Sequence, residues 1–290
     1  MKKMILLFAL CVAFHCSGQL LWKVSGGDLP KPSYVFGTYH VAPEHFIEKV
    51  PGLLQVIDSV DAIVVEVKEE EITNPSNFDT YIQSMYAPVD STLDVVFSPE
   101  EYREVDSLLR QVLMCDTISL CSYNHYKPST VVQLLENDIF SSLMGIDFDS
   151  VPLLDSSLER CVNARGKPSY GLETFEYQFQ LLNKASLRQQ ADDLKDMLSN
   201  YNDCAFEAAR LSIAYFMQDL ERVREIVNES PSDLDMLECA ERNKAWVPKI
   251  LKLARAQPVL VCVGAAHLVE PFTGLLYLLK QAGYEVAPVL

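Results

Sequence analysis

The sequence predicts an α/β fold, with a central mixed or parallel sheet built from both chain ends and a large helical insertion covering the cleft. Apolar runs typical of buried strands, "SYVFG" at 33–37 and "DAIVVEV" at 61–67, flank a helical segment near the start of the chain. Two more, "PVLVCVG" at 258–264 and "YEVAPVL" at 284–290, lie at the other end. Residues from about 98 to 240 have mainly helical patterns. We therefore expect the two chain ends to meet in one sheet.

Helix-start and helix-stop signals mark the elements between these strands. Ser98, Pro99 and Glu101 have the spacing of a capping box at the start of a helix. Gly166 and Gly283 follow helical patterns, where glycine is suited to end a helix. Helices are expected at about 43–59, 98–113, 130–144, 153–166 and 270–283, with others between 174 and 256. A short strand is expected in "KPSYGLE", 167–173.

The first residues, 1–18, have the pattern of a secretory signal. Two lysines precede an apolar run that is too short to span a bilayer, and small residues follow it. We expect cleavage there, with residues 19–290 forming a single domain that includes the helical insertion. Cys16 offers an alternative, a lipid anchor attached just after the apolar run. Either way, the protein is predicted to be extracytoplasmic, either periplasmic or secreted.

The charge of the chain limits its partners. The formal net charge is −16, and −18 without the two lysines of the signal. Such an acidic surface argues against binding to nucleic acid or to anionic membranes. No later stretch is apolar for long enough to span a bilayer. The charge does not choose a substrate, which we expect to be a peptide or a small molecule.

Six cysteines follow the predicted signal. In an oxidising compartment some of them could pair, and the "CDTISLC" segment could close a local loop between Cys115 and Cys121. Cys262 lies in an apolar strand and is expected to be a buried thiol. None of the six has zinc-finger spacing, so we do not expect a thiolate metal site.

Two histidines occur in the same local context, more than 220 residues apart. "FGTYH" at 36–40 and "VGAAH" at 263–267 each end an apolar strand with Gly-x-x-His. Loops at the carboxyl ends of strands form the ligand-binding crevice of open α/β sheets. If the two strands are parallel neighbours, His40 and His267 face the same crevice. The alternative is that each histidine has a structural role, with its ring nitrogens paired in local hydrogen bonds.

Two carboxylates follow expected strands in the same way. Glu66 ends an apolar run, and a buried carboxylate needs a partner or a metal, unless the charged residues after it keep it exposed. Glu173 ends the short strand, or it favours the positive end of the next helix. Two histidines with one or two carboxylates suit a hydrolytic metal site, and equally a metal-free acid–base pair.

Arg242 and Asn243 occur in "ERNKAW", within a helical pattern. A guanidinium there could hold a carboxylate or an oxyanion, or it could be a solvated residue on the outside of the helix. His45 and His125 lack a matching context. The sequence has no phosphate loop, no Gly-x-Ser-x-Gly elbow and no His-Glu-x-x-His helix, which excludes the common ATPases, α/β-hydrolases and zincins.

The chain resembles the TraB/GumN family, whose animal relatives are the Tiki proteins. The resemblance rests on "LLWKVSG", "FGTYHVAPE", "DAIVVEV", "MGIDFDSVPLLDSSL", "KPSYGLETFEYQ", "ERNKAWVPKI" and "VCVGAAHLVEPFTGLLYLLKQAGYEVAPV", in that order. It implies an α/β fold related to erythromycin-esterase-like and ChaN-like proteins. It also implies a metal-dependent protease activity like that described for Tiki proteins.

The resemblance assigns expected roles to individual residues. His40, Glu66 and His267 correspond to ligands of a divalent metal, expected to be Mn, Co or Zn. Catalytic roles are implied for Glu173, as a further ligand or general base, and for Arg242 and Asn243, as oxyanion or carboxylate partners.

The chain matches the family pattern at one further position and departs from it at two. Asp147 matches the acidic position of the Gly-x-Asp block. Tyr39 stands where many members have a smaller residue and could narrow the site, and "GAAH" has alanine where glycine is frequent.

Three functions follow from these expectations. The first is a metal-dependent hydrolase, a peptidase acting through the two-His/Glu site. The second is a metal-free hydrolase in which His40 is the general base. The third is a protein that binds a peptide or small ligand without cleaving it.

Overall fold

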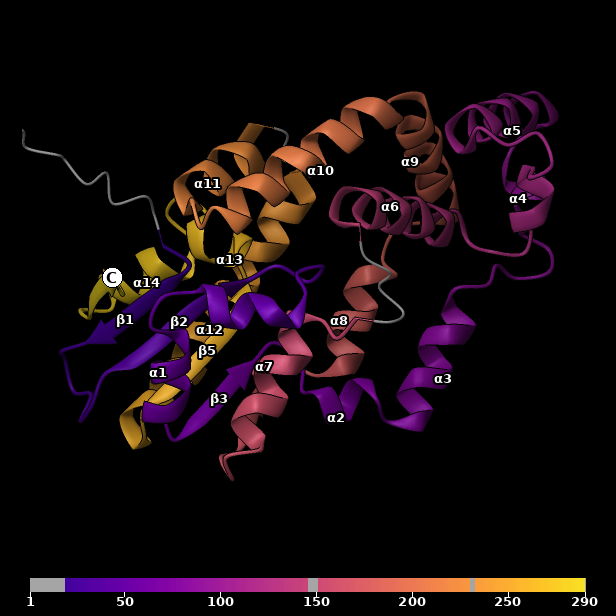
Figure 1. The fold of residues 1–290 in the computed structure, drawn as a ribbon. Helices are drawn as coiled ribbons and strands as arrows, with labels where there is room; N and C mark the ends of the chain where they lie inside the picture. The colour runs from indigo at the N-terminus through magenta and orange to yellow at the C-terminus, as the bar shows by residue number, and fades with distance from the viewer. Residues whose placement is uncertain (1–18, 146–150, 230–232, 290) are drawn as a thin grey trace, which may run out of the picture.

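Strands from both ends of the chain lie side by side in one six-stranded sheet (Figure 1). The computed structural model describes residues 19–145, 151–229 and 233–289. The expected signal with Cys16, and Asp147, therefore lie outside the described residues. The order β4-β3-β5-β2-β1-β6 confirms the mixed α/β fold. The strands are β1 Leu21–Ser25, β2 Ser33–Thr38, β3 Ala62–Val65, β4 Ser169–Gly171, β5 Val259–Gly264 and β6 Glu285–Pro288.

Four neighbouring strands, β4, β3, β5 and β2, run parallel. Strand β1, which had no strand prediction, pairs antiparallel with both β2 and β6. Thr38 at the end of β2 is opposite Gly264 at the end of β5, and Val65 of β3 is opposite Cys262. The carboxyl ends of the parallel strands therefore lie along one edge of the sheet.

Helices cover both faces of the parallel strands, which explains why β3 and most of β5 are buried on both sides. Thr38 donates a hydrogen bond to Asp155 of one covering helix, whereas a side chain at the preceding Gly37 would contact Ala265 and Leu268. Successive residues of a strand point to opposite faces, so these contacts define the two layers. The first contains η1 Glu44–Lys49, α1 Leu53–Ser59 and α7 Leu154–Asn163. The second contains α12 Asp233–Ala256, α13 Ala266–Val269 and α14 Leu275–Gln281.

Several of the remaining helices form a second packing unit beside the sheet, whereas α11 and the end of α10 pack against the sheet core (Figure 1). Buried apolar residues of α4, α5, α6 and α9 make a hydrophobic cluster separate from the sheet core. Helix α5 begins with the predicted capping box, since Ser98 and Glu101 bond each other's backbone. The helices are α2 Glu69–Ile72, α3 Pro75–Ser84, α4 Leu93–Val96, α5 Pro99–Leu113, η2 Leu120–Tyr123, α6 Pro128–Met144, α8 Phe175–Leu182, α9 Leu187–Ser199, α10 Tyr201–Phe216 and α11 Leu220–Glu229.

Two expected helices differ from the structure. The helix expected at 43–59 is divided into η1 and α1, because Gly52 adopts a φ of +77° between them. The helix expected at 270–283 begins only at Leu275, after Phe272 takes a φ of +64°. Glycine and proline near both breaks, Pro51 and Pro271, favour these interruptions.

The cysteines remain separate thiols. No disulfide links the six cysteines in the described part of the chain, so the local loop between Cys115 and Cys121 does not form. Cys262 is buried in β5, as expected, and burial raises the pKa of its thiol. No helix among the described residues is long and apolar enough to cross a membrane.

Candidate active site

The edge formed by the parallel strands brings the predicted site residues together. Glu173 follows β4, Glu66 follows β3, His267 follows β5 and His40 follows β2, in the order of the strands across the sheet. The strands that carry the two histidines are parallel neighbours, which was the condition for a shared crevice. Arg242, from the long helix α12, reaches the same edge.

The two motif glycines make room for this arrangement. A Cβ at Gly37 would lie 3.1 Å from the Ala265 backbone and from Leu268, so β2 and α13 pack too closely for a side chain. A Cβ at Gly264 would lie 3.6 Å from Glu66 Oε1, 3.6 Å from His40 Nε2 and 3.7 Å from His267 Cδ2. The missing side chain of Gly264 therefore leaves a space that these three groups surround.

His40 is held by a carboxylate that the sequence analysis did not identify. Its Nδ1 lies 3.2 Å from Oδ2 of Asp155, in the first turn of α7, and Thr38 Oγ1 donates to Oδ1 of the same residue at 2.6 Å. The charge of Asp155 and this hydrogen bond raise the pKa of His40 to about 9. The side chain of His40 keeps 69% of its accessible surface because it faces an open cavity. Asp155 thus orients an imidazole that solvent or a substrate can reach.

His267 is held by an amide instead. Its Nδ1 lies 2.8 Å from Oδ1 of Asn243, which is fully buried and also donates to the backbone oxygens of His267 and Thr273. Nε2 of His267 accepts from Nη1 of Arg242 at 3.1 Å. Burial lowers the pKa of His267 to about 4, so this imidazole is neutral at pH 7. A neutral ring with Nδ1–H and a lone pair on Nε2 fits both contacts.

Arg242 links both carboxylates of the site. Its Nη2 donates to Glu66 at 2.7 Å and to Glu173 at 2.6 Å, and its Nε donates to the second oxygen of Glu173 at 3.1 Å. Although burial opposes ionisation, His267, which becomes charged only in the acid range where Glu66 itself titrates, together with the charges of His40 and Arg242, holds the pKa of Glu66 below its usual range. The solvated-arginine alternative does not apply here, because only 16% of this side chain is exposed.

Glu173 is almost enclosed by donors. Besides Arg242, Trp246 donates from its indole nitrogen at 3.2 Å, and Gln178 donates from Nε2 at 3.2 Å. Gln178 also reaches Glu66 at 3.3 Å. Only 4% of the Glu173 side chain is exposed, so both of its oxygens are committed to protein partners.

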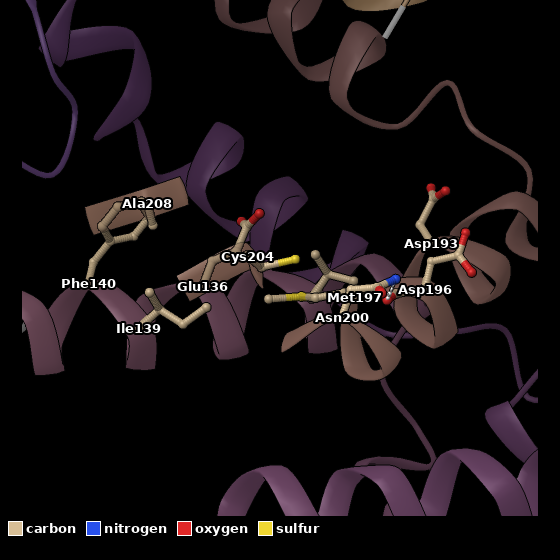
Figure 2. A pocket seen from close by; sticks show the side chains of 10 residues that line it. Glu136, Ile139, Phe140, Asp193, Asp196, Met197, Asn200, Cys204 and Ala208 are labelled. Atoms are coloured by element: carbon tan, nitrogen blue, oxygen red, sulfur yellow. Dashed lines mark hydrogen bonds between the residues drawn. The ribbon is translucent and has the colours of Figure 1, made fainter. Parts of the chain in front are cut away.

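A cavity of about 340 Å³ opens onto this edge and reaches His40, Glu66, Asp155 and Gln178. A second cavity, of about 390 Å³, lies between helices α6, α9 and α10 (Figure 2). The side chains that line the second cavity include acids and apolar groups but no histidine or arginine. Of the groups expected for hydrolysis, His40 and Glu66 therefore line the first cavity, whereas His267, Glu173 and Arg242 do not line it.

The donor types suit a divalent cation, although the side chains that the structure describes are not arranged around a metal position. Both histidines have Nδ1 against an oxygen, which is how protein partners usually orient metal-binding imidazoles and leave Nε2 available. Glu66 Oε1 lies 4.0 Å from His267 Nε2, beside the space at Gly264. Among the described residues, no group of three His, Cys, Asp or Glu side chains lies close enough together to hold a metal ion in this arrangement. Here Arg242 rather than a cation engages Nε2 of His267.

Asp155 and Gln178 are site residues that sequence reasoning missed. Asp155 stands in the first turn of an amphipathic helix, where an acidic residue is common for electrostatic reasons alone. Gln178 lies on α8, one turn after Glu173, and has no distinguishing motif. Only the folded chain brings Asp155 to His40, across a separation of 115 residues.

Comparison with known proteins agrees with this architecture. The family model described as "TraB/PrgY/gumN family" matches residues 20–288. A protein of Amphimedon queenslandica named "Metalloprotease TIKI homolog" is 21% identical over 94% of this chain, and the chain spans 63% of that relative's length. No solved structure matches. From the strand-end motifs and the extent of the family match, we conclude that the chain belongs to the TraB/PrgY/gumN family.

Proposed function

We propose that this protein is a metal-dependent hydrolase that cleaves a peptide outside the cytoplasm. The observation that carries the proposal is the matched orientation of His40 and His267, each with Nδ1 against an oxygen and each beside Glu66 at the space left by Gly264. The relative named as a metalloprotease supports hydrolysis, and the signal pattern at 1–18 supports an extracytoplasmic location.

His40, Glu66 and His267 would hold the cation, which we expect to be Mn, Co or Zn. A bound divalent cation supplies Lewis acidity and lowers the pKa of a bound water. Asp155 and Asn243 would keep the two imidazoles in the orientation that binding requires, since each holds the Nδ1 side of its ring.

Arg242 would stabilise the negative charge that develops on the substrate oxygen. A guanidinium in a partly buried site is well suited to this role, because its charge is fixed in place before the reaction. Glu173 was expected to be a ligand or a general base. Because its oxygens accept from Arg242, Trp246 and Gln178, we assign it to holding the guanidinium instead.

A metal-free hydrolase is the second candidate, and one contact favours it. Nη1 of Arg242 donates to the Nε2 lone pair of His267 that a cation would need. In that arrangement, His40 with a pKa of about 9 carries a proton at pH 7. It would then donate a proton to the leaving group rather than act as the general base.

A peptide-library assay tests the proposal. The purified protein is incubated with the library and added Mn, Co or Zn, and products are identified by mass spectrometry. Cleavage should be lost in His40→Ala and Glu66→Gln and kept in His125→Ala, a histidine outside the site. Full turnover by His40→Ala or Glu66→Gln would contradict the proposal, and wild-type activity that survives chelation would favour the metal-free candidate.

A further inference from the structure

An apolar groove of about 520 Å³ lies between the end of α6 and the second half of α10. Three apolar side chains of this groove, Leu143, Ile213 and Met217, are 44%, 65% and 73% exposed. A concave, mostly apolar surface with a few polar groups is typical of ligand sites. Its lining includes Pro43, Leu143, Met144, Ser212, Ile213 and Met217.

Tyr39 connects this groove to the candidate active site. The ring of Tyr39 packs between Phe140 of α6 and Tyr215 of α10, with centroid distances of 5.9 and 5.1 Å. Its hydroxyl lies 3.3 Å from Oγ of Ser212, which lines the groove. Because Tyr39 directly precedes His40, the same turn carries the histidine and a residue that contacts the lining of the groove.

The groove is within reach of a peptide whose scissile bond lies at His40. Pro43 lines the groove and follows His40 by three residues, which span at most about 11 Å. An extended peptide advances about 3.3 Å per residue, so side chains a few positions from the scissile bond would arrive at the groove.

We propose that this groove is a specificity subsite that binds apolar side chains on one side of the scissile bond of the peptide substrate. The inference rests on the proposed function and adds the class of substrate. Met144 and Met217 can adapt to side chains of different shape, and the Ser212 hydroxyl in the lining offers a polar contact to a peptide backbone. The net charge of −16 disfavours a second copy or an anionic lipid surface as the occupant.

Binding of a defined peptide tests the subsite apart from catalysis. The probe is fluorescein-labelled Ser-Gly-Leu-Val-Phe-Leu-Gly-Ser, compared with a peptide in which its Leu, Val and Phe residues are replaced by Ser, Thr and Asn. Fluorescence anisotropy is measured with the full chain in a His40→Ala/His267→Ala background, so the probe stays intact. We expect the apolar peptide to bind and the polar one not to bind. Adding Ile213→Glu and Met217→Glu should weaken binding by about tenfold or more.

Phe78→Glu is the matched control. Phe78 is 52% exposed on α3 and lines neither the groove nor the cavity at His40, so its replacement should leave the Kd unchanged. An unchanged Kd in the Ile213→Glu/Met217→Glu protein would overturn the inference. A dimer in sedimentation velocity that this double variant dissociates would also overturn it, by assigning the groove to a second copy.

Steady-state assays of the wild-type protein separate the two proposals. If the groove binds the apolar peptide but no peptide is cleaved with any metal, the proposed function fails and the groove remains only as a site that binds an apolar peptide. If peptides are cleaved but Ile213→Glu/Met217→Glu leaves KM for the apolar peptide unchanged, the subsite fails and the hydrolase stands.

Discussion

Oδ2 of Asp155 lies 3.2 Å from Nδ1 of His40. The two residues come from different layers of the fold, a helix on the sheet face and the loop after β2. The second oxygen of Asp155 accepts from Thr38, at the end of the same strand. Strand β2 therefore fixes both the histidine and the carboxylate that orients it.

Asp155→Asn should weaken the site without removing any proposed ligand. Loss of a carboxylate that orients a metal-binding histidine typically lowers metal affinity or activity by about 10- to 100-fold. Metal affinity is measured by competition with a chromogenic chelator, and kcat/KM with a cleaved peptide. Thr38→Val, which removes only one hydrogen bond to Asp155, should have a smaller effect. Wild-type affinity and activity in Asp155→Asn would contradict this role.

Arg242→Ala should destabilise the fold, because Glu66 and Glu173 would lose their shared positive partner in a mostly buried site. Removing one member of a buried ion pair costs about 3–5 kcal/mol. Arg255→Ala removes a solvent-exposed pair with Asp28 and should lower the free energy of unfolding far less, because water and salt screen the pair. Urea unfolding followed by circular dichroism compares the two variants. If both variants lost only a similar, small part of the free energy of unfolding, Arg242 would not be the group that stabilises the two buried carboxylates.

Alanine at the two motif glycines should have different consequences. At Gly37 the added Cβ meets backbone and side-chain atoms at 3.1–3.2 Å, so Gly37→Ala should lower the free energy of unfolding by about 1–3 kcal/mol. At Gly264 the nearest atoms are at 3.6 Å, which the fold can accommodate. Gly264→Ala should therefore keep near-normal stability but lose metal binding and activity. Thermal unfolding and activity assays check both variants. A Gly264→Ala protein that keeps metal binding and activity would show that the space at Gly264 is not functional.

Asn243→Leu should affect both stability and His267. The change leaves the backbone oxygens of His267 and Thr273 without this donor, and it leaves His267 Nδ1 with only the weaker contact to Cys239 Sγ at 3.2 Å. Each unsatisfied buried group costs about 1–3 kcal/mol, so we expect a loss of about 3 kcal/mol or more in urea unfolding. Asn163→Leu, at an exposed position, should change the stability by about 0.5 kcal/mol or less. A similar small effect in both variants would refute this account of Asn243.

The strand pattern of the sequence predicted much of the fold and the location of the site. Apolar runs at both ends identified four of the strands, and the short strand before Glu173 was also recognised. Because those strands are parallel neighbours, residues that follow them must converge, which placed His40, His267 and Glu66 together. Strand β1 was missed because Lys23 interrupts the apolar run of "LWKVS".

The contacts between site residues could not be predicted in the same way. Glu173 and Arg242 are 69 residues apart in the sequence, and nothing in the sequence indicates that they form an ion pair. Asp155 looks like an ordinary acidic residue near a helix start, and only the packing of α7 on β2 gives it a role. The helices covering the sheet thus supply the partners that the strand-end motifs do not reveal.

Metal content tests the central claim most directly. The protein is purified without chelator, reconstituted with Mn, Co or Zn, and analysed by inductively coupled plasma mass spectrometry beside a His40→Ala/His267→Ala variant of confirmed fold. We predict near-stoichiometric metal in the wild-type protein and almost none in the variant. Absence of metal from both proteins, or equal amounts in both, would contradict a metal site at the paired Gly-x-x-His motifs.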